Sequence, residues 1–312
     1  MSLERALALA DAALGIAYPN PTVGAVVVAG DGSVVGEGVT EAYGGRHGEV
    51  VALEAADVAA SGATLYVTME PCTHHGRTPP CVDAILAAGV ARAVVGSLDP
   101  NPGAGGGLER LRAGGVEVEL DDRPEARRQN EAWRTWISCG RPFVTLKLAV
   151  SLDGHVVVPG RRWVTGDAAR RQVHELRARV DAVAVGMGTV RADDPRLDVR
   201  GVSVARQPRR LAFGRGPLPD DSELELRTGT LEEELAALAA EGAQSLLLEG
   251  GPTLGAAFVE ADLVDRFVLH VAPVLAGDGP HVLGSLSAPV ELRELTAEQV
   301  GDDVVLRAER AT

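Results

Sequence analysis

The stretch "MEPCTHHGRTPPCVDAIL", residues 69–86, contains two of the three cysteines in this 312-residue chain. An apolar strand pattern, "ATLYVTM" at 63–69, leads into it. A helix pattern, "PPCVDAILAAG" at 79–89, leads out of it, with prolines at its start and glycine at its end. Cys72 therefore follows a strand and Cys81 begins a helix. The pair could form a disulfide, a structural metal clip or two ligands of a catalytic metal.

On both sides of this stretch, strand and helix patterns alternate, which predicts an α/β fold with sheets covered by helices. Upstream, an amphipathic helix pattern is followed by a hairpin signature around Asp31-Gly32. In the first half, we expect helices at 1–15, 47–62, 79–89, 107–115 and 124–138, the hairpin at 22–39, and strands at 63–69, 90–100 and 116–120.

The stretch "SCGRPFVTLKLAVSLDG", residues 138–154, indicates a domain boundary, because Gly140 and Pro142 interrupt the pattern and a long strand begins near Phe143. A chain of 312 residues is also too long for one ordinary core. We therefore expect one domain at 1–140 and a second at 141–312. The second half again alternates, with strands at 181–186 and 243–251 and helices at 231–242 and 252–262.

The formal net charge is −14, with −8 on residues 1–140 and −6 on residues 141–312. A surface of this sign repels polyanions, so we expect no nucleic-acid partner, whereas a small anion held by local arginines fits. Glu4, Arg5 and Asp11 argue against a secretory signal, and no uncharged apolar run approaches the ~18 residues of a membrane span. We expect a cytoplasmic protein without a membrane partner, and a reducing compartment argues against a disulfide.

His47 and Glu49 form a His-x-Glu pattern at the start of the expected 47–62 helix, and Pro71-Cys72 follows the next strand. This combination is typical of zinc-dependent deaminases. His47, Cys72 and Cys81 would hold zinc through one imidazole and two thiolates, which leaves the fourth tetrahedral position for water. Glu49 would carry protons between that water and the leaving amine. The alternative is a structural zinc with His74 or His75 as fourth ligand, but it gives Glu49 no role.

"EPCTHHGRTPPC", together with "NPTVGAVVV" at 20–28, "HGE" at 47–49 and "DPNP" at 99–102, closely resembles the deaminase domain of bifunctional riboflavin-biosynthesis deaminase/reductases. The resemblance implies a cytidine-deaminase-like α/β/α domain whose substrate is a small phosphorylated pyrimidine. By position it assigns substrate binding to Asn20, His74, Arg77 and Asn101. Arginine suits phosphate because its guanidinium can donate two parallel hydrogen bonds. Gly48 departs from the family's alanine.

"KLAVSLDG" at 147–154, "WVTG" at 163–166, "DDPRLDVR" at 193–200 and "EGGPTL" at 249–254 resemble the reductase domain of the same proteins. That domain has a dihydrofolate-reductase-like α/β fold and uses NADPH. The resemblance assigns the cofactor to Ala149, Trp163, Thr189, Asp193, Gly251, Pro252, Thr253, Leu254, Gly255, Ala256 and Ala257. It assigns the substrate to Arg177, Leu197, Arg200 and Glu249.

From the residues alone, Gly250 and Gly251 before Pro252 fit either an anion site at a helix start or an ordinary strand–helix turn. Lys147 is the only lysine beside 29 arginines, which indicates either a specific task or coincidence. Four places depart from the reductase pattern. Arg161 stands where the family has serine, and "RRLAFGR" at 209–215 stands where it has a strand ending in Asp-Ser. The segments between Asp153 and Trp163 and between Arg210 and Glu249 are shorter than in the family.

The leading hypothesis is a bifunctional enzyme with zinc and NADPH as cofactors. It would deaminate 2,5-diamino-6-(5-phosphoribosylamino)pyrimidin-4-one and then reduce the ribose of the product to a ribityl chain. In the first alternative, the second half lacks reductase activity and serves assembly. The others are a nucleic-acid editing deaminase, which the charge disfavours, and a regulatory protein with a structural zinc. The family resemblance also implies a homo-oligomer, either a dimer or a tetramer.

Overall fold

The computed structural model describes residues 2–204 and 206–311. The chain forms two compact units, the first ending at Cys139 and the second beginning at Gly140. Both units are α/β, as the sequence predicts. Within the described part of the chain, every helix is too short or too polar to span a bilayer.

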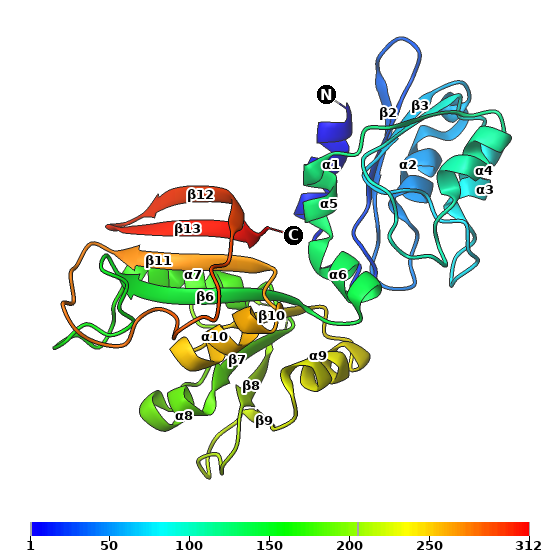
Figure 1. Ribbon diagram of the computed structural model, residues 1–312. Coiled ribbons are helices and arrows are strands. Elements are labelled where there is room, and N and C mark those ends of the chain that lie inside the picture. Colours follow the sequence, from blue (N-terminus) through cyan, green and yellow to red (C-terminus); the bar gives the residue numbers. More distant parts are fainter. Residues whose placement is uncertain (1, 205, 312) are drawn as a thin grey trace. The chain divides into compact units, whose positions relative to one another are not determined.

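The first unit is built on a five-stranded sheet of order β2-β1-β3-β4-β5 (Figure 1). β1 (Gly24–Val28) pairs antiparallel with β2 (Val34–Val39) and β3 (Thr64–Val67). β4 (Arg92–Val95) and β5 (Glu117–Leu120) continue the sheet in parallel with β3. The hairpin expected around Asp31-Gly32 is confirmed, with Gly32 in the left-handed region at φ 87°.

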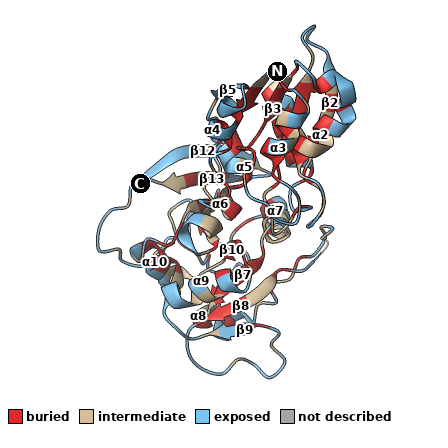
Figure 2. Cartoon of the chain, turned by 90° about the vertical axis from the view of Figure 1, so that its right-hand side faces the viewer, coloured by how far each residue is buried: buried red, intermediate tan, exposed pale blue. Residues whose placement is uncertain are grey.

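Helices cover both faces of this sheet. α1 (Ser2–Ala12) packs Leu3 and Ala6 on the face that carries Val26. On the other face, α2 (Gly48–Ala56), α3 (Cys81–Ala87) and α4 (Gly107–Ala113) pack against Val27 and Leu65. The alternation of Val26 and Val27 between the two faces follows from the two-residue period of a strand. The buried residues accordingly lie between helices and sheet (Figure 2).

α2 lies directly on β2 because glycines leave room for its backbone. A Cβ at Gly38 would come within 2.3 Å of the Gly48 carbonyl oxygen and 2.4 Å of the Ala52 nitrogen. This close approach fixes the start of α2, the point at which His47 and Glu49 stand.

Two of the expected helices are not continuous α-helices over the range that the sequence pattern indicates. The 47–62 helix ends as α2 at Ala56 and continues as a 3₁₀ turn, η1 (Asp57–Ala60). The 124–138 helix divides into α5 (Pro124–Gln129) and α6 (Glu131–Cys139). The Asn130 side chain between them accepts a hydrogen bond from the Thr22 N–H and donates one to the Thr22 carbonyl, both at 2.9 Å. The helix is interrupted at Asn130, where these two tertiary hydrogen bonds hold the side chain.

The second unit contains an eight-stranded sheet of order β12-β13-β11-β6-β10-β7-β8-β9. From β11 to β9 all neighbours are parallel, and β12 and β13 add an antiparallel hairpin at one edge. The strands are β6 (Phe143–Ser151), β7 (Ala182–Gly186), β8 (Arg209–Phe213), β9 (Glu225–Arg227), β10 (Ser245–Leu248), β11 (Arg266–Ala272), β12 (Leu292–Val300) and β13 (Asp303–Arg310).

The helices of this unit are α7 (Asp167–Arg177), α8 (Met187–Asp193), α9 (Leu231–Ala240) and α10 (Pro252–Glu260). One buried cluster joins β6 and β10 to α9 and α10, with Leu146, Leu248, Leu238 and Phe258 at its centre. A second cluster joins β7 to α8 through Val183, Met187 and Val190 on the same sheet. The unit therefore presents the carboxyl ends of several parallel strands along one edge, where ligands bind in such sheets.

Candidate active sites

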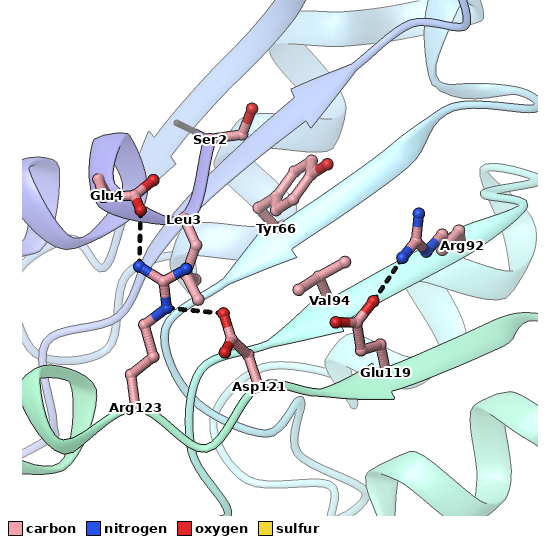
Figure 3. Close-up of a pocket in the computed structure, with 9 residues that line it drawn as sticks. All are labelled: Ser2, Leu3, Glu4, Tyr66, Arg92, Val94, Glu119, Asp121 and Arg123. Atoms are coloured by element: carbon pink, nitrogen blue, oxygen red, sulfur yellow. Dashed lines mark hydrogen bonds and ion pairs between the residues drawn. The ribbon is translucent and has the colours of Figure 1, made fainter.

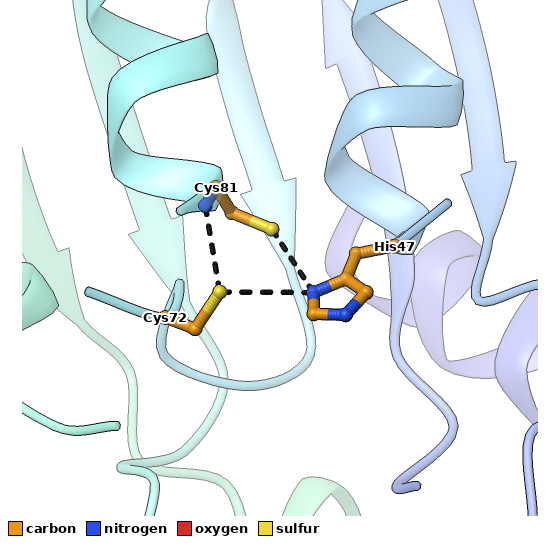
Figure 4. Close-up of side chains that lie close together, drawn as sticks. All are labelled: His47, Cys72 and Cys81. Carbon is orange, nitrogen blue, oxygen red and sulfur yellow. Dashed lines mark hydrogen bonds between the residues drawn. The ribbon is translucent and has the colours of Figure 1, made fainter. Parts of the chain in front are cut away.

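The first candidate site lies where α2 and α3 begin. His47 directly precedes α2, Cys81 is the first residue of α3, and Cys72 follows β3. His47 Nδ1 is 3.7 Å from Cys72 Sγ and 3.2 Å from Cys81 Sγ, and the three potential ligand atoms all lie within 4.8 Å of one another (Figure 4). Tetrahedral zinc with ordinary bond lengths would separate its ligand atoms by about 3.6 to 3.8 Å. The donor set and its spacing therefore fit zinc.

The two cysteines of this cluster share their protonation. Both cysteines are buried and neither forms a disulfide. Hydrogen bonds from Cys81 and His47 lower the pKa of Cys72 to about 4, so this sulfur is a thiolate. The same contact with Cys72 raises the pKa of Cys81, because in the absence of a cation one proton is shared by the two sulfurs. A dication between them would replace that proton.

Glu49 is the second residue of α2, two residues after His47, and is 3 % exposed. Burial, followed by the nearby charge of Cys72, raises the pKa of Glu49 to about 7. Among the residues that the structure describes, nothing forms a hydrogen bond to its buried Oε2. A carboxyl group that titrates near neutrality and keeps one oxygen unpaired can both accept and donate a proton.

The loop between the cysteines is exposed at His74, His75 and Arg77. Neither histidine belongs to the potential ligand cluster, so the structure offers neither of them as a fourth ligand beside His47. The Arg77 guanidinium lies over the Tyr43 ring, 4.5 Å from its centroid. Thr78 Oγ1 is 3.4 Å from Nε2 of His47, the ring nitrogen that faces away from the sulfurs. The sequence interpretation missed both Tyr43 and Thr78.

Glu70 is a further residue that the sequence interpretation missed. Its carboxylate is 6 % exposed and accepts hydrogen bonds from the Asp99 and Leu108 N–H groups, both at 3.2 Å. These bonds fix the two ends of the loop that contains Asn101. In the sequence, the only sign that Glu70 holds this loop is its place directly before Pro71-Cys72.

The remaining substrate residues expected in the first unit are Asn20 and Asn101. Asn101 lies in the loop held by Glu70, and its Oδ1 accepts the Gly103 N–H at 3.0 Å, which leaves its amide N–H groups for a ligand. Thr73 joins this loop to the cysteine segment through a 2.9 Å bond to the Gly105 carbonyl. Asn20 is half-buried just before β1.

The second candidate site surrounds Lys147 on β6 and Glu249 after β10. Arg177 at the end of α7 donates to Glu249 Oε2 at 3.0 Å and to the Asp198 carbonyl at 2.9 Å. Burial raises the pKa of Glu249, but the Arg177 hydrogen bond and the charges of Arg177 and Lys147 outweigh it and leave the pKa below its usual value. Burial lowers the pKa of Lys147, against the charge of Glu249. Lys147, Arg177 and Glu249 therefore form a compact group of charged side chains with little exposure to solvent.

The other residues expected in the second unit are less uniformly placed. Thr189 on α8 faces the Gly251 turn, since a Cβ at Gly251 would lie 3.4 Å from Thr189 Oγ1. Leu197 is 2 % exposed and its side chain packs in the cluster around Val183, so only its backbone can contact a substrate. Trp163 is 54 % exposed.

The rest lie as follows: Ala149 half-buried on β6, Asp193 at the end of α8, Arg200 paired with Asp198 at 3.3 Å, and Pro252, Thr253, Leu254, Gly255, Ala256 and Ala257 in the first turns of α10.

A separate hollow of about 340 Å³ on the first unit contains none of the expected site residues (Figure 3). Both of its arginines are neutralised: Arg123 pairs with Glu4 and Asp121, each at 2.6 Å, and Arg92 pairs with Glu119. The buried carboxyl group whose pKa is raised toward neutrality, Glu49, lies at the zinc-ligand cluster instead, and that cluster has the chemistry of an active site.

A His/Cys/Cys cluster beside a buried glutamate, at the helix starts of an α/β/α sheet, defines the class of zinc-dependent deaminases. Comparison with known proteins agrees. The family described as "Cytidine and deoxycytidylate deaminase zinc-binding region" matches residues 2–97, and the "RibD C-terminal domain" family matches residues 142–306. The chain belongs to the RibD family of riboflavin biosynthesis proteins.

Relatives match this chain over nearly its whole length. Riboflavin biosynthesis protein RibD of Aquifex aeolicus is 38% identical, over 97% of this chain and 96% of the relative. RibD of Mycobacterium tuberculosis H37Rv is 40% identical, over 94% and 91%. A structure of Acinetobacter baumannii RibD superposes with a TM-score of 0.87 at 33% identity, covering 100% and 98% of the two chains.

A Thermotoga maritima structure described as a diaminohydroxyphosphoribosylaminopyrimidine deaminase/5-amino-6-(5-phosphoribosylamino)uracil reductase is also similar. It superposes with a TM-score of 0.85 at 32% identity, over 99% and 98% of the chains. The resemblance and the bifunctional class read from the sequence are confirmed, as are the α/β class, the deaminase-like first half and the reductase-type second half.

Proposed function

We propose that this chain carries out two consecutive steps of riboflavin biosynthesis. The domain at 1–140 deaminates 2,5-diamino-6-(5-phosphoribosylamino)pyrimidin-4-one with the help of zinc. The domain at 141–312 then reduces the ribose of the product to a ribityl chain with NADPH. The observation that carries the proposal is the convergence of His47, Cys72 and Cys81 within 4.8 Å, next to buried Glu49.

In the deamination, His47, Cys72 and Cys81 hold the zinc. Bound there, zinc would lower the pKa of water and so supply a nucleophile for the ring carbon that carries the amino group. Glu49 is placed to accept a proton at the cluster and to donate it to the departing nitrogen as ammonia forms. Its pKa of about 7 suits both directions of transfer.

The substrate phosphate is bound by the loop between the cysteines. Arg77 and His74 are the phosphate donors, and the Arg77 guanidinium is supported by the Tyr43 ring beneath it. Asn20 and Asn101 hold the ring and the ribose phosphate. The loop between the cysteines thus binds the substrate next to the zinc.

In the reduction, NADPH supplies the hydride and the protein aligns cofactor and substrate. Arg177, Leu197, Arg200 and Glu249 bind the substrate, and Lys147 is held beside Glu249 at the same group. Ala149, Trp163, Thr189, Asp193 and the Gly251–Ala257 turn bind the cofactor. The enzyme acts in the cytoplasm as a homo-oligomer, and its charge of −14 is consistent with small-molecule substrates and no nucleic-acid partner.

A single assay of the purified protein tests both activities. With the diaminopyrimidine substrate alone, we expect ammonia release. When NADPH is added, its absorbance should fall in proportion to the deaminated product. Ammonia release without NADPH oxidation would remove the reductase half of the proposal and leave a deaminase whose second unit serves assembly. Absence of both signals would contradict the whole proposal.

A further inference from the structure

Glycines concentrate at the carboxyl ends of three neighbouring parallel strands, β10, β7 and β8. Gly186 ends β7 and pairs in register with Phe213, the last residue of β8, and Gly214 follows directly. A Cβ at Gly214 would lie 3.1 Å from the Met187 side chain, whereas a Cβ at Gly188 would meet nothing within 4 Å. The edge between α8 and the end of β8 is therefore packed at Gly214 and open at Gly188, in the first turn of α8.

Two arginines border this edge. Arg191 on α8 donates from Nη2 to the Arg215 carbonyl at 2.7 Å. Gly216 makes room for that contact, since its φ is 117° and a Cβ there would lie 2.8 Å from Arg191 Nη2. Arg191 thereby fixes the backbone that carries the Arg215 side chain.

Arg191 and Arg215 differ in their ion pairing from the arginines of β8 and β9 nearby. Arg209, Arg210 and Arg227 each pair with glutamates. Within residues 2–204 and 206–311, no carboxylate lies within 4.0 Å of either Arg191 or Arg215, and both side chains are exposed. Two uncompensated positive charges beside an open, glycine-lined edge suit an anion.

The position of this edge along the cofactor site identifies the anion. The residues proposed for NADPH run from Ala149 on β6, past the Gly251 turn after β10, to Thr189 on α8, which follows the strand order β6-β10-β7-β8. Hydride transfer places the nicotinamide near the Arg177–Glu249 substrate group, toward β6 and β10. The adenosine end then lies toward β8. There NADPH differs from NADH only by a phosphate on the 2′ oxygen.

We propose that Arg215 binds the 2′-phosphate of NADPH and that Arg191 is the positioning residue that holds the Arg215 segment. The inference rests on the proposed use of NADPH and adds the residue that distinguishes it from NADH. The "RRLAFGR" segment, which departs from the family pattern, is thus the part of this chain that selects the phosphorylated cofactor.

The test is the preference of Arg215→Ala for the two cofactors in the full chain. The ratio of kcat/KM for NADPH to kcat/KM for NADH should fall about tenfold or more, because a hydrogen bond between charged groups is lost. Adenosine 2′,5′-bisphosphate measures the same contact by calorimetry without turnover, with adenosine 5′-monophosphate as the reference ligand. Its affinity advantage over the monophosphate should shrink by a similar factor.

Arg179→Ala is the matched control, because Arg179 is exposed at the opposite, amino end of β7. It should leave the cofactor ratio and the affinity advantage at their wild-type values. If the wild type oxidises NADPH but Arg215→Ala keeps the wild-type cofactor ratio and the wild-type affinity for the bisphosphate, the inference is wrong. A wild type that binds neither dinucleotide would overturn the proposed reductase function together with the inference.

Discussion

At the scale of single residues, Glu49 distinguishes the proposed catalytic zinc site from a structural one. A structural site needs only ligands, yet here a carboxyl group is buried beside the cluster with one oxygen unpaired among the described residues. Such a group costs free energy of folding unless a ligand or a metal-associated water completes its hydrogen bonds. The sequence pattern predicted this role because His-x-Glu places both side chains at one helix start.

Replacement of Glu49 by glutamine tests that role. The amide has nearly the same shape but cannot carry the proton, so kcat for deamination should fall by about 10² to 10⁴. Zinc content, measured by atomic absorption, should stay at the wild-type value because the ligands are unchanged. A variant with normal zinc and near-normal turnover would contradict the role of Glu49 as proton carrier.

Other residues of the site could not be read from the sequence because their roles depend on tertiary contacts. Glu70 binds N–H groups of a loop nearly thirty residues later, at Asp99. Tyr43 stacks under Arg77, which lies in a different loop. Neither contact leaves a local pattern, whereas His47, Cys72 and Cys81 do so because helix starts and strand ends can be predicted.

At the scale of elements, the packing of α2 on β2 positions the zinc ligand. Gly38→Ala should destabilise the first unit by about 1 to 3 kcal/mol, because the new methyl group meets backbone atoms that cannot give way. Gly30→Ala is the control, since a Cβ there meets nothing within 4 Å. Urea unfolding of the zinc-loaded proteins checks this, and equal midpoints for the two variants would argue against close helix–strand packing.

β11 and α7 are joined by His270, which is 0 % exposed and whose Nε2 lies 3.0 Å from Gln172 Oε1. Burial, aided by the charges of Lys147 and Arg307, lowers the pKa of His270 to about 4. The unfolded state therefore binds a proton between about pH 6.5 and 4 that the folded state excludes. This contribution to stability is complete above pH 6.5 and is lost as the pH falls toward 4.

The His270 contribution should amount to about 2 kcal/mol between pH 7 and pH 5. Hydrogen exchange of β11 and β6 amides, corrected for intrinsic rates, measures it within the second unit. Protection in the wild type should decrease between pH 7 and pH 5, and His270→Gln, which cannot titrate, should show a smaller decrease. An identical pH dependence in both proteins would show that His270 is not the responsible group.

Element types were more predictable than element ends. The alternation of strand and helix patterns predicted β1 to β5 and the helices between them, because each buries one face with a clear period. The division of the 124–138 helix at Asn130 was not predicted, because it depends on a bond to Thr22. The β12–β13 hairpin was also missed: β12 is almost entirely exposed and carries no hydrophobic alternation.

At the scale of the whole molecule, two units of different architecture occur in one chain, and relatives match both together. Gly140 and Pro142 indicated the junction because they interrupt the strand and helix patterns, and the chain divides between Cys139 and Gly140. Composition left room for a small anionic substrate. With a net charge of −14, local arginines would have to supply the attraction for such an anion, and Arg77 is the one proposed for the substrate phosphate.

The most direct test of the account removes the metal and follows both activities in the same sample. Dialysis against a chelator should abolish ammonia release, and about one equivalent of zinc should restore it. NADPH oxidation with added deaminated substrate should stay unchanged throughout, since the described residues of the second unit contain no cluster of potential metal ligands. Undiminished deamination by protein shown to contain no zinc would contradict the central claim that His47, Cys72 and Cys81 hold a catalytic metal.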